Sequence, residues 1–467
     1  MFNFYLIMKR ILILFLLLPA LYSFSQDGSI DEATLQKIRS SFTANGETRA
    51  LMNAISSNDI KKLAINRSNL GKVTPYFSHK IDIKGISDQK SSGRCWLFTG
   101  LNMLRIKVIE KYKLEDFEFS QNYSFFWDQL EKSNLFLETI LATADKPMDD
   151  KTVEWLFRNP IGDGGQWTGV VDIVDKYGLV PAEAMPESQN SENTSMMSRL
   201  LRRKLREDGL KLRLIRQTEA NENVIQDMKT RMLSDIYRIL ALSLGEPPQK
   251  FIWQYKDADG NISKATEYTP LSFYSEVLDV NLKDYVMLMN DPTRDYYKVY
   301  EIEYDRHILE GGNWKYINLP VDEIKNFAAA SIKDNEPLYF SCDVGKQLNS
   351  EDGLLDIHNY DYGDMFGVTF GLDKAQRIST FESGSSHGMS LIGVNIIENG
   401  SIDKWLLENS WGEKGQKGLL VMTDEWFDEY MFRLVVHQKY MDQKTLDILK
   451  TEPVLLPPWD PMFAPEN

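Results

Sequence analysis

The stretch QKSSGRCWLFTG, residues 89–100, places a thiol where a glycine-bearing loop becomes an apolar helix. From Cys95 to Lys113, apolar residues recur at spacings of three and four, which predicts a buried helix that begins at the cysteine. Unpaired N–H groups and the dipole at a helix N-terminus stabilise a thiolate. Cys95 is therefore a candidate nucleophile, although a cysteine at a helix start is by itself more often a small buried hydrophobe.

Gln89 lies on the same loop, six residues before Cys95. At this distance its side-chain amide can face the same substrate atom as the backbone N–H of Cys95. Two such donors form an oxyanion hole.

A thiol nucleophile needs an imidazole, and the chain has five, which are His79, His307, His358, His387 and His437. His387 stands in SSHGMSLIGVN, residues 385–395, where small residues precede it and an apolar strand follows. This setting leaves the ring accessible at a strand start, and the other four histidines lack it.

A third candidate, Asn409, follows a short apolar strand in WLLENSWGEKGQKG, residues 405–418. Its carboxamide can fix the tautomer of His387, and Trp411 can screen that contact from water, which completes a Cys-His-Asn set. Taken singly, His387 is equally compatible with a hydrogen-bonded strand residue and Asn409 with a turn former.

Helical patterns come first in the chain and strand patterns follow. The segment from Asn193 to Leu244 is predicted to form two helices, with breaks at Asp208–Gly209 and at Gly245. Short β-rich runs come later, at residues 286–289, 297–304, 389–397 and 404–407. This order predicts an α+β fold class.

The composition, with 43% hydrophobic and 26% charged residues, is that of a folded globular protein. A net charge of −15 disfavours general attraction to nucleic acid or anionic membranes. With two cysteines in 467 residues, a disulfide scaffold is excluded, and Cys342, which ends the apolar run PLYFSC, is predicted to be a buried strand residue.

Residues 191–216 form a basic stretch inside this acidic chain. Its basic members are Arg199, Arg202, Arg203, Lys204, Arg206, Lys211, Arg213 and Arg216. The stretch could attract acidic peptide or nucleic acid, but a solvated helix face or an interface with acidic surface is favoured.

The first 25 residues have the layout of a secretory signal peptide. Lys9 and Arg10 precede an apolar run, and Ser23 and Ser25 flank a bulky residue. A membrane anchor is the alternative, but Pro19 interrupts the run before it reaches spanning length. The pattern predicts a soluble protein without a membrane span, exported to the periplasm or the cell exterior after cleavage near Ser25.

Together these strings resemble the active-site signatures of papain-like cysteine peptidases, in the right chain order. The finer resemblance is to the bleomycin hydrolase and aminopeptidase C family, and it extends over nearly all of the chain after residue 25. Further matching strings are FEFSQNY (117–123), GDGGQW (162–167), KYGLVP (176–181), CDVGK (342–346), MTDEWF (422–427) and LPPWDPM (456–462).

The resemblance implies roles for individual residues. It makes Cys95 the nucleophile, His387 the general base and then acid, and Asn409 the residue that orients the imidazole. It makes Gln89 the oxyanion donor. Two glycines, Gly164 and Gly165, would line the substrate, where the missing Cβ lets a peptide backbone approach; from the sequence alone they fit a plain turn equally well.

The resemblance also implies a two-lobed papain-like fold with added segments. His387 lies 292 residues after Cys95, far more than the 130–150 typical of papain. The expected segments are a signal peptide (1–25), an N-terminal extension (26–70), a helical lobe (71–185), a helical insertion with oligomer contacts (186–262), a β-rich lobe (263–450) and a C-terminal arm (451–467).

The implied function is an exported cysteine aminopeptidase that acts on peptides with a free N-terminus, forms a homohexamer and needs no metal or organic cofactor. In such an enzyme the carboxylate of Asn467 blocks one side of the cleft and pairs with the substrate ammonium. The alternatives are an endopeptidase or acyl transferase on the same scaffold, and a non-catalytic cage or binding protein.

The chain departs from the family pattern at two places. Phe463 stands where a glycine is usual after Met462, with Glu466 adding a carboxylate close to the terminus. Asp88 stands where an asparagine is usual before the glutamine.

Overall fold

Three capped helices form the first of the two units into which the chain divides, at residues 65 and 66. The computed structural model describes residues 28–71, 74–219 and 221–463, so the predicted signal segment and Asn467 lie outside the described residues. The helices are α2 (Glu32–Ser40), α3 (Gly46–Ser57) and α4 (Ile60–Leu63), and none of their residues is buried. Their N-termini are capped by side-chain oxygens of Asp31, Asn45 and Asp59.

The second unit, from residue 66 onward, begins with mostly helical structure. Its helices before residue 245 are η1 (Arg67–Asn69), α5 (Cys95–Tyr112), α6 (Gln121–Ala142), α7 (Lys151–Arg158), α8 (Trp167–Tyr177), η2 (Ala182–Ala184), α9 (Gln189–Glu192), α10 (Ser195–Arg216) and α11 (Glu222–Leu244). Later helices are α12 (Pro270–Phe273), η3 (Tyr274–Leu278), η4 (Leu282–Asp284), α13 (Val321–Lys333), α14 (Tyr362–Phe366), α15 (Lys374–Ser379), α16 (Lys414–Lys417), α17 (Asp424–Tyr430), η5 (Gln438–Tyr440) and α18 (Gln443–Ile448).

The strands lie almost entirely after residue 250. They are β1 (His79–Lys80), β2 (Phe251–Trp253), β3 (Thr266–Tyr268), β4 (Tyr285–Met289), β5 (Lys298–Ile302), β6 (Lys315–Asn318), β7 (Leu338–Cys342), β8 (Leu348–Asn349), β9 (Leu354–Leu355), β10 (His387–Ile396), β11 (Ile402–Glu408), β12 (Leu419–Thr423), β13 (Met431–His437) and β14 (Val454–Leu456). Helices first and strands later confirm the predicted α+β class.

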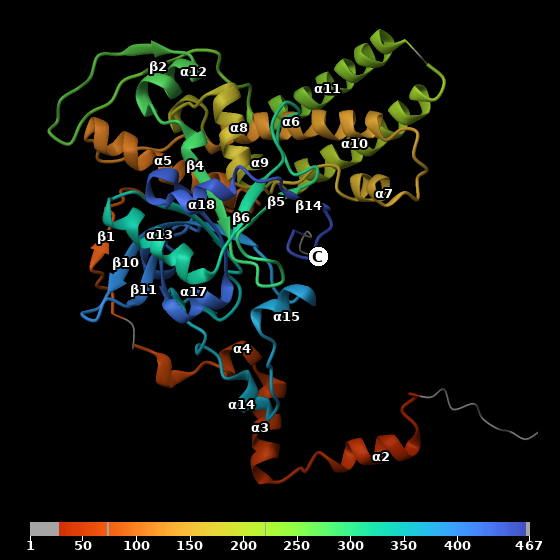
Figure 1. Ribbon diagram of the computed structural model, residues 1–467, viewed down its shortest axis with the longest axis vertical. Coiled ribbons are helices and arrows are strands. Elements are labelled where there is room, and N and C mark those ends of the chain that lie inside the picture. Colours follow the sequence, from red (N-terminus) through yellow and green to blue (C-terminus); the bar gives the residue numbers. More distant parts are fainter. Residues whose placement is uncertain (1–27, 72–73, 220, 464–467) are drawn as a thin grey trace, which may run out of the picture. The chain divides into compact units, whose positions relative to one another are not determined.

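One large mixed sheet organises the second part of this unit. Its strand order is β14-β5-β6-β4-β13-β7-β10-β11-β12-β9-β8, with β1 paired to β10. The central strands β7, β10 and β11 pair antiparallel, and β14 pairs parallel to β5 at one edge. Helix α5 packs against β10 and β7, so the segment that begins at Cys95 lies against the strand that begins at His387 (Figure 1).

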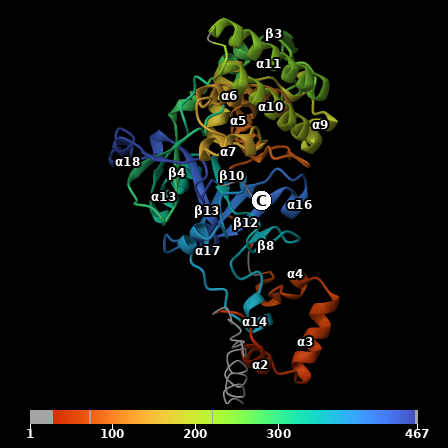
Figure 2. The same cartoon turned by 90° about the vertical axis from the view of Figure 1, so that its right-hand side faces the viewer.

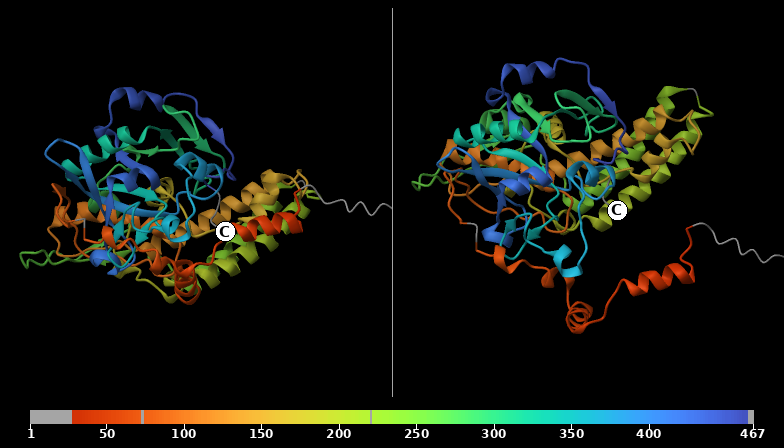
Figure 3. Two further views of the ribbon diagram at one scale, coloured as in Figure 1. Left: turned by 90° about the horizontal axis from the view of Figure 1, so that it is seen from below. Right: turned by 60° about the horizontal axis from the view of Figure 1, so that its bottom comes forward.

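Helices α6, α10 and α11 lie side by side on the opposite side of α5 from the sheet (Figures 2 and 3). Their shared core includes Phe136, Leu201, Leu205 and Ile236, all at most 4% exposed. The apolar face that each helix presents at helical spacing is buried by its two neighbours.

The predicted break at Asp208–Gly209 is wrong, because α10 runs unbroken through both residues. A Cβ on Gly209 would lie 3.0 Å from ring atoms of Phe136, so the glycine permits close contact between α10 and α6. Asp208 is buried and pairs with Lys204 one turn earlier. Both residues serve helix packing, and the chain instead turns at residues 217–218, directly after α10.

Cys342 ends the central strand β7 and is fully buried, as predicted. Burial, followed by the negative charge of Asp343, raises the pKa of its thiol well above the ordinary value. This thiol therefore stays protonated and belongs to the core.

Truncation of one core leucine tests the placement of the sheet. Leu288 in β4 is fully buried, whereas Leu242 in α11 is 74% exposed. We expect Leu288→Ala to lower the free energy of unfolding by about 2–5 kcal/mol, and Leu242→Ala to change it by no more than about 0.5 kcal/mol. Urea unfolding measures both, and equal effects would contradict this core.

Candidate active site

Cys95 is the first residue of α5 and is partly exposed. Burial by itself raises the pKa of its thiol, but a hydrogen bond and the charge of His387 outweigh burial. Backbone N–H groups of Gly388 and Trp96 also favour the thiolate, and the net result is a pKa below the ordinary value. Cys95 lies at the helix start that the sequence predicts, and the imidazole lowers the pKa of its thiol more than the backbone N–H groups do.

His387 opens β10, where it pairs in register with Cys342 of β7, and is 6% exposed. Burial lowers the pKa of its imidazole, but the hydrogen bond and charge of Cys95, with a hydrogen bond to Asn409, outweigh burial and raise the pKa. The two shifts have opposite directions, which is the condition for a thiolate beside an imidazolium.

Asn409 follows β11, and its Oδ1 lies 2.8 Å from Nε2 of His387. The same oxygen accepts the N–H of Ser410 at 2.8 Å, which fixes the orientation of the carboxamide. Because Nε2 of the ring donates to Asn409, Nδ1 is the nitrogen left to face Cys95. The ring of Trp411 lies 4.7 Å from the imidazole of His387, centroid to centroid.

Gln89 is 6% exposed and is held from two sides. Its backbone N–H donates to the carbonyl of Ser410 at 2.9 Å, and its Oε1 accepts the hydroxyl of Ser410 at 2.7 Å. Its Nε2 donates to the carbonyl of Ser92 at 2.7 Å. An amide nitrogen carries two hydrogens, so one remains for an oxygen in the cleft.

Three of these predicted residues, Cys95, His387 and Gln89, line one cleft of about 1020 Å³, together with Trp411, Gly164 and Gly165. Asn409 is 1% exposed and reaches the cleft only through its hydrogen bond to His387. A Cβ on Gly164 would meet nothing within 4 Å, so this glycine opens onto free space. A Cβ on Gly165 would lie 2.5 Å from His307 and 2.7 Å from Trp96, so only glycine fits there.

The cleft also receives the described end of the C-terminal segment, because Met462 and Phe463 line it. The ring of Phe463 packs edge-on against Trp314, with centroids 5.0 Å apart. Asp460 forms an ion pair with Arg294, and β14 holds the preceding residues against β5. Phe463, which stands where a glycine is usual in the family, thus makes an aromatic contact with Trp314.

Sequence reasoning missed a second histidine in the cleft. His307 is 2% exposed, lines the cleft and places Nδ1 2.5 Å from Oδ1 of Asp128. Asp128 also pairs with Lys132, whose Nζ donates to the carbonyl of Gly164 at 2.6 Å. One signal in the sequence could have indicated this pair. Asp128 is an acidic residue in an otherwise apolar helical stretch, and a buried carboxylate needs a partner.

Much of the basic stretch of residues 191–216 is used inside the subunit. Arg213 donates to the carbonyls of Thr143 and Lys146, and Arg206 donates to those of Phe157 and Arg158. Further members are paired with acids of α10 and α11. These members of the stretch therefore have partners within the subunit.

Asp88, the second departure from the family pattern, has a local role. Its carboxylate accepts the backbone N–H of Lys90 at 2.9 Å and pairs with the ammonium of Lys90 at 2.7 Å. Its backbone forms a bridge with Trp411. Asp88 therefore holds the loop that carries Gln89 next to Trp411, whose ring lies beside His387.

Within residues 28–71, 74–219 and 221–463, no group of three or more His, Cys, Asp and Glu side chains is arranged to hold a metal ion. Over the same residues, no helix combines the length and the apolar character needed to cross a bilayer.

A partly exposed thiol beside a buried imidazole, on a mixed α+β scaffold, defines a cysteine peptidase. Residues 29–463 match the Peptidase C1-like family, and the chain belongs to this family. Human bleomycin hydrolase is 40% identical over 424 residues, which cover 88% of this chain and 93% of that protein. Aminopeptidase C of Listeria innocua is 38% identical over 431 residues, which cover 92% and 97%.

A solved structure agrees with these relatives. The crystal structure of PepW from Lactobacillus rhamnosis is 38% identical and superposes with a TM-score of 0.91, covering 94% of this chain and 99% of that one. The resemblance to the bleomycin hydrolase and aminopeptidase C family is therefore confirmed.

The predicted export to the periplasm or the cell exterior is wrong. Bleomycin hydrolase, aminopeptidase C and aminopeptidase G align with most of this chain and are cytosolic enzymes. The prediction used only the charge and apolar pattern around Lys9 and Arg10, in residues that the structure does not describe. A compositional pattern over so few residues is outweighed by relatives that align over more than 420.

The role of His387 in ionising Cys95 is testable by alkylation. We expect His387→Ala to raise the pKa of Cys95, because burial then acts without the imidazole that opposes it. The rate of reaction with iodoacetamide, measured over a pH series, should therefore need a higher pH to reach its plateau. His358→Ala, at an exposed histidine, is the control, and identical profiles for the two variants would contradict the pairing.

Proposed function

We propose that this cysteine peptidase is an aminopeptidase that removes N-terminal residues from peptides through Cys95, His387 and Asn409. The observation that supports this most is the hydrogen bond between the thiol of Cys95 and the imidazole of His387 in a cleft large enough for a peptide. The bond from His387 to Asn409 adds the third member of the set.

In the proposed reaction, the thiolate of Cys95 attacks the scissile carbonyl carbon and the carbonyl π electrons move to oxygen. The side-chain amide of Gln89 and the backbone N–H of Cys95 donate to that oxyanion. Collapse of the tetrahedral intermediate breaks the C–N bond, and His387 gives its proton to the leaving amine.

Deacylation uses the same residues in reverse. His387, now neutral, accepts a proton from water, and the hydroxide formed attacks the thioester carbon. Collapse of the second intermediate releases the carboxylic acid and returns the thiolate, with His387 protonated again. Asn409 holds the ring in one tautomer throughout, and Trp411 keeps water from their bond.

The C-terminal arm, residues 451–467, supplies the proposed restriction to free N-termini. Met462 and Phe463, at the described end of the arm, line the cleft. The carboxylate of Asn467 would fill the non-primed side and pair with the α-ammonium of the substrate. The acidic residues that line the described cleft are Asp305 and Asp343, and Asp343 already accepts the hydroxyl of Ser383 at 2.7 Å.

The proposed architecture is papain-like, with a helical lobe (71–185), a β-rich lobe (263–450) and a helical insertion (186–262). We include the homohexamer that the family resemblance implies. Exposed apolar side chains along α10, which are Met196, Leu200, Leu210 and Leu214, offer a surface for contacts between copies.

Cleavage of paired substrates tests the aminopeptidase proposal. We expect the enzyme to cleave a fluorogenic peptide with a free N-terminus and to leave its N-acetylated form intact, and Cys95→Ser to lose at least about 10³-fold in kcat/KM. Equal cleavage of both peptides would instead indicate an endopeptidase. Transfer of the acyl group to added amines would indicate a transferase, and full activity of Cys95→Ser would contradict the mechanism.

The arm has its own test. We expect removal of residues 464–467 to abolish the preference for a free N-terminus, because the terminal carboxylate is then on Phe463, four residues short of the position proposed to pair with the substrate ammonium. Asn467→Ala is the matched control, since it keeps the terminal carboxylate and should keep the preference. The ratio of kcat/KM for free and N-acetylated peptides measures both, and an unchanged ratio after truncation would contradict the role of the arm.

A further inference from the structure

Arg94, the residue before the nucleophile, is fully buried and has a carboxylate partner from the start of the proposed insertion. Its Nη1 and Nη2 lie 3.0 Å and 2.8 Å from the two carboxylate oxygens of Glu187. The guanidinium also lies over the rings of Phe98 and Phe125, at 5.1 Å and 5.4 Å from their centroids. A bidentate pair of this kind fixes the plane of the guanidinium.

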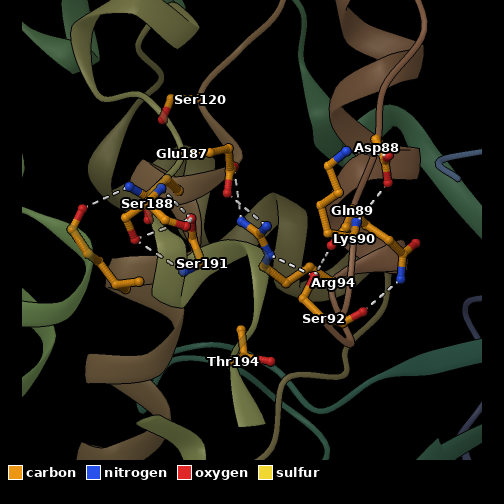
Figure 4. Close-up of polar contacts among 12 residues, drawn as sticks. Asp88, Gln89, Lys90, Ser92, Arg94, Ser120, Glu187, Ser188, Ser191 and Thr194 are labelled. Atoms are coloured by element: carbon orange, nitrogen blue, oxygen red, sulfur yellow. Dashed lines mark hydrogen bonds and ion pairs between the residues drawn. The ribbon is translucent and has the colours of Figure 1, made fainter. Parts of the chain in front are cut away.

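The Nε–H group of Arg94 points toward the loop that carries Gln89. Nε donates to the hydroxyl of Ser92 at 3.0 Å, and that hydroxyl donates to the backbone carbonyl of Gln89 at 2.7 Å. In return, Nε2 of Gln89 donates to the backbone carbonyl of Ser92 at 2.7 Å. Figure 4 shows this order, with Arg94 between Glu187 and Ser92, and Gln89 beyond. The orientation of the Gln89 amide thus depends on Ser92 as well as on the hydroxyl of Ser410, and that of Ser92 depends on Arg94.

Other hydrogen bonds hold the loop before Cys95 against residues 187–198. The N–H of Ser91 donates to the carbonyl of Glu192 at 2.9 Å. Asp163, beside the substrate-lining glycines, accepts the N–H of Gly93 at 3.3 Å and the hydroxyl of Ser198 at 2.8 Å. The loop before Cys95 is therefore held by residues 187–198 as well as by the sheet.

Loss of the Glu187 charge would act on this loop in a defined way. A buried guanidinium without its carboxylate seeks other acceptors, and leaving such a charge uncompensated is strongly unfavourable. Besides Glu187, the guanidinium of Arg94 already donates to the hydroxyl of Ser92, on the Gln89–Ser92 loop. A shift of Ser92 moves the carbonyl that orients the Gln89 amide, whereas the bond between His387 and Asn409 involves none of these residues.

We propose that Glu187 is a positioning residue that, through Arg94 and Ser92, orients the oxyanion-binding amide of Gln89. The inference rests on the proposed function, in which Gln89 stabilises the oxyanion. It makes the start of the insertion part of the catalytic apparatus: Glu187 touches no reacting atom, but it fixes the donor that does.

Glu187→Gln tests the proposal, because the amide keeps the shape and removes the charge. Two reagents separate oxyanion binding from thiolate reactivity. A peptide aldehyde with a free N-terminus adds to Cys95 as a tetrahedral hemithioacetal that uses the oxyanion donors, whereas iodoacetamide reacts with the thiolate and forms no oxyanion. We expect about tenfold weaker binding of the aldehyde and a similar fall in kcat, less than the roughly 10²-fold fall for Gln89→Ala. KM and the pH profile of alkylation should stay unchanged.

A double-mutant cycle decides whether Glu187 acts through Gln89. If it does, Glu187→Gln should weaken aldehyde binding by less than about twofold in a Gln89→Ala background. The matched control is Glu118→Gln, which removes a carboxylate of similar exposure from another buried arginine, Arg105, and should leave aldehyde binding unchanged. Ser92→Ala, which removes only the linking hydroxyl, should reproduce the loss and decides the question if Glu187→Gln fails to fold.

Each other outcome overturns the proposal. An equal loss with and without Gln89, or a parallel loss of alkylation, would mean that the pair only stabilises the loop. Unchanged aldehyde binding in Glu187→Gln would mean that the pair does not orient the donor. If Gln89→Ala itself binds the aldehyde as tightly as the wild type, the oxyanion role of Gln89 in the proposed function fails as well, which distinguishes the two failures.

Discussion

The contact between the sulfur of Cys95 and the imidazole of His387 is the interaction on which the rest of the site depends. It joins residues that are 292 positions apart, so it exists only when the first buried helix lies against the central strands. Helix α5 starts at the sulfur and β10 starts at the ring, and the packing of α5 on β10 brings both starts together. Burial disfavours charge on both groups, but each lies close enough to the other to outweigh burial, so the pKa of Cys95 is lowered and that of His387 is raised.

The parts of this site that were predictable are those encoded by short local patterns. The apolar spacing after Cys95 predicts the helix and the apolar run after His387 predicts the strand, because both patterns are set by side chains on one element. Asn409 was predictable because it ends a strand, and the observed bond to His387 follows from the antiparallel pairing of β10 and β11. Gly209 led to the wrong prediction of a helix break, because a glycine that breaks a helix and one that lets two helices pack closely look the same in a single sequence.

Contacts between distant segments were not predictable. Neither Glu187 nor Asp128 stands in a motif, and their partners, Arg94 and His307, lie 93 and 179 residues away. In both cases a buried charge required a partner, but the sequence does not say which segment supplies it. The error about export has a related origin, since a local pattern was interpreted without the relatives that give the whole chain its context.

Burial of the second thiol, Cys342, affects how the enzyme recovers from oxidation. Cys342 pairs in register with His387, yet its thiol is fully buried and its pKa is raised well above the ordinary value. An oxidant would therefore react first with Cys95, whose lowered pKa favours the thiolate, and a sulfenic acid formed there would find only the buried thiol of Cys342, whose raised pKa disfavours the thiolate needed to close a disulfide. Without such a resolving thiol, recovery depends on small thiols from solution, and their absence lets oxidation proceed to the irreversible sulfinic acid.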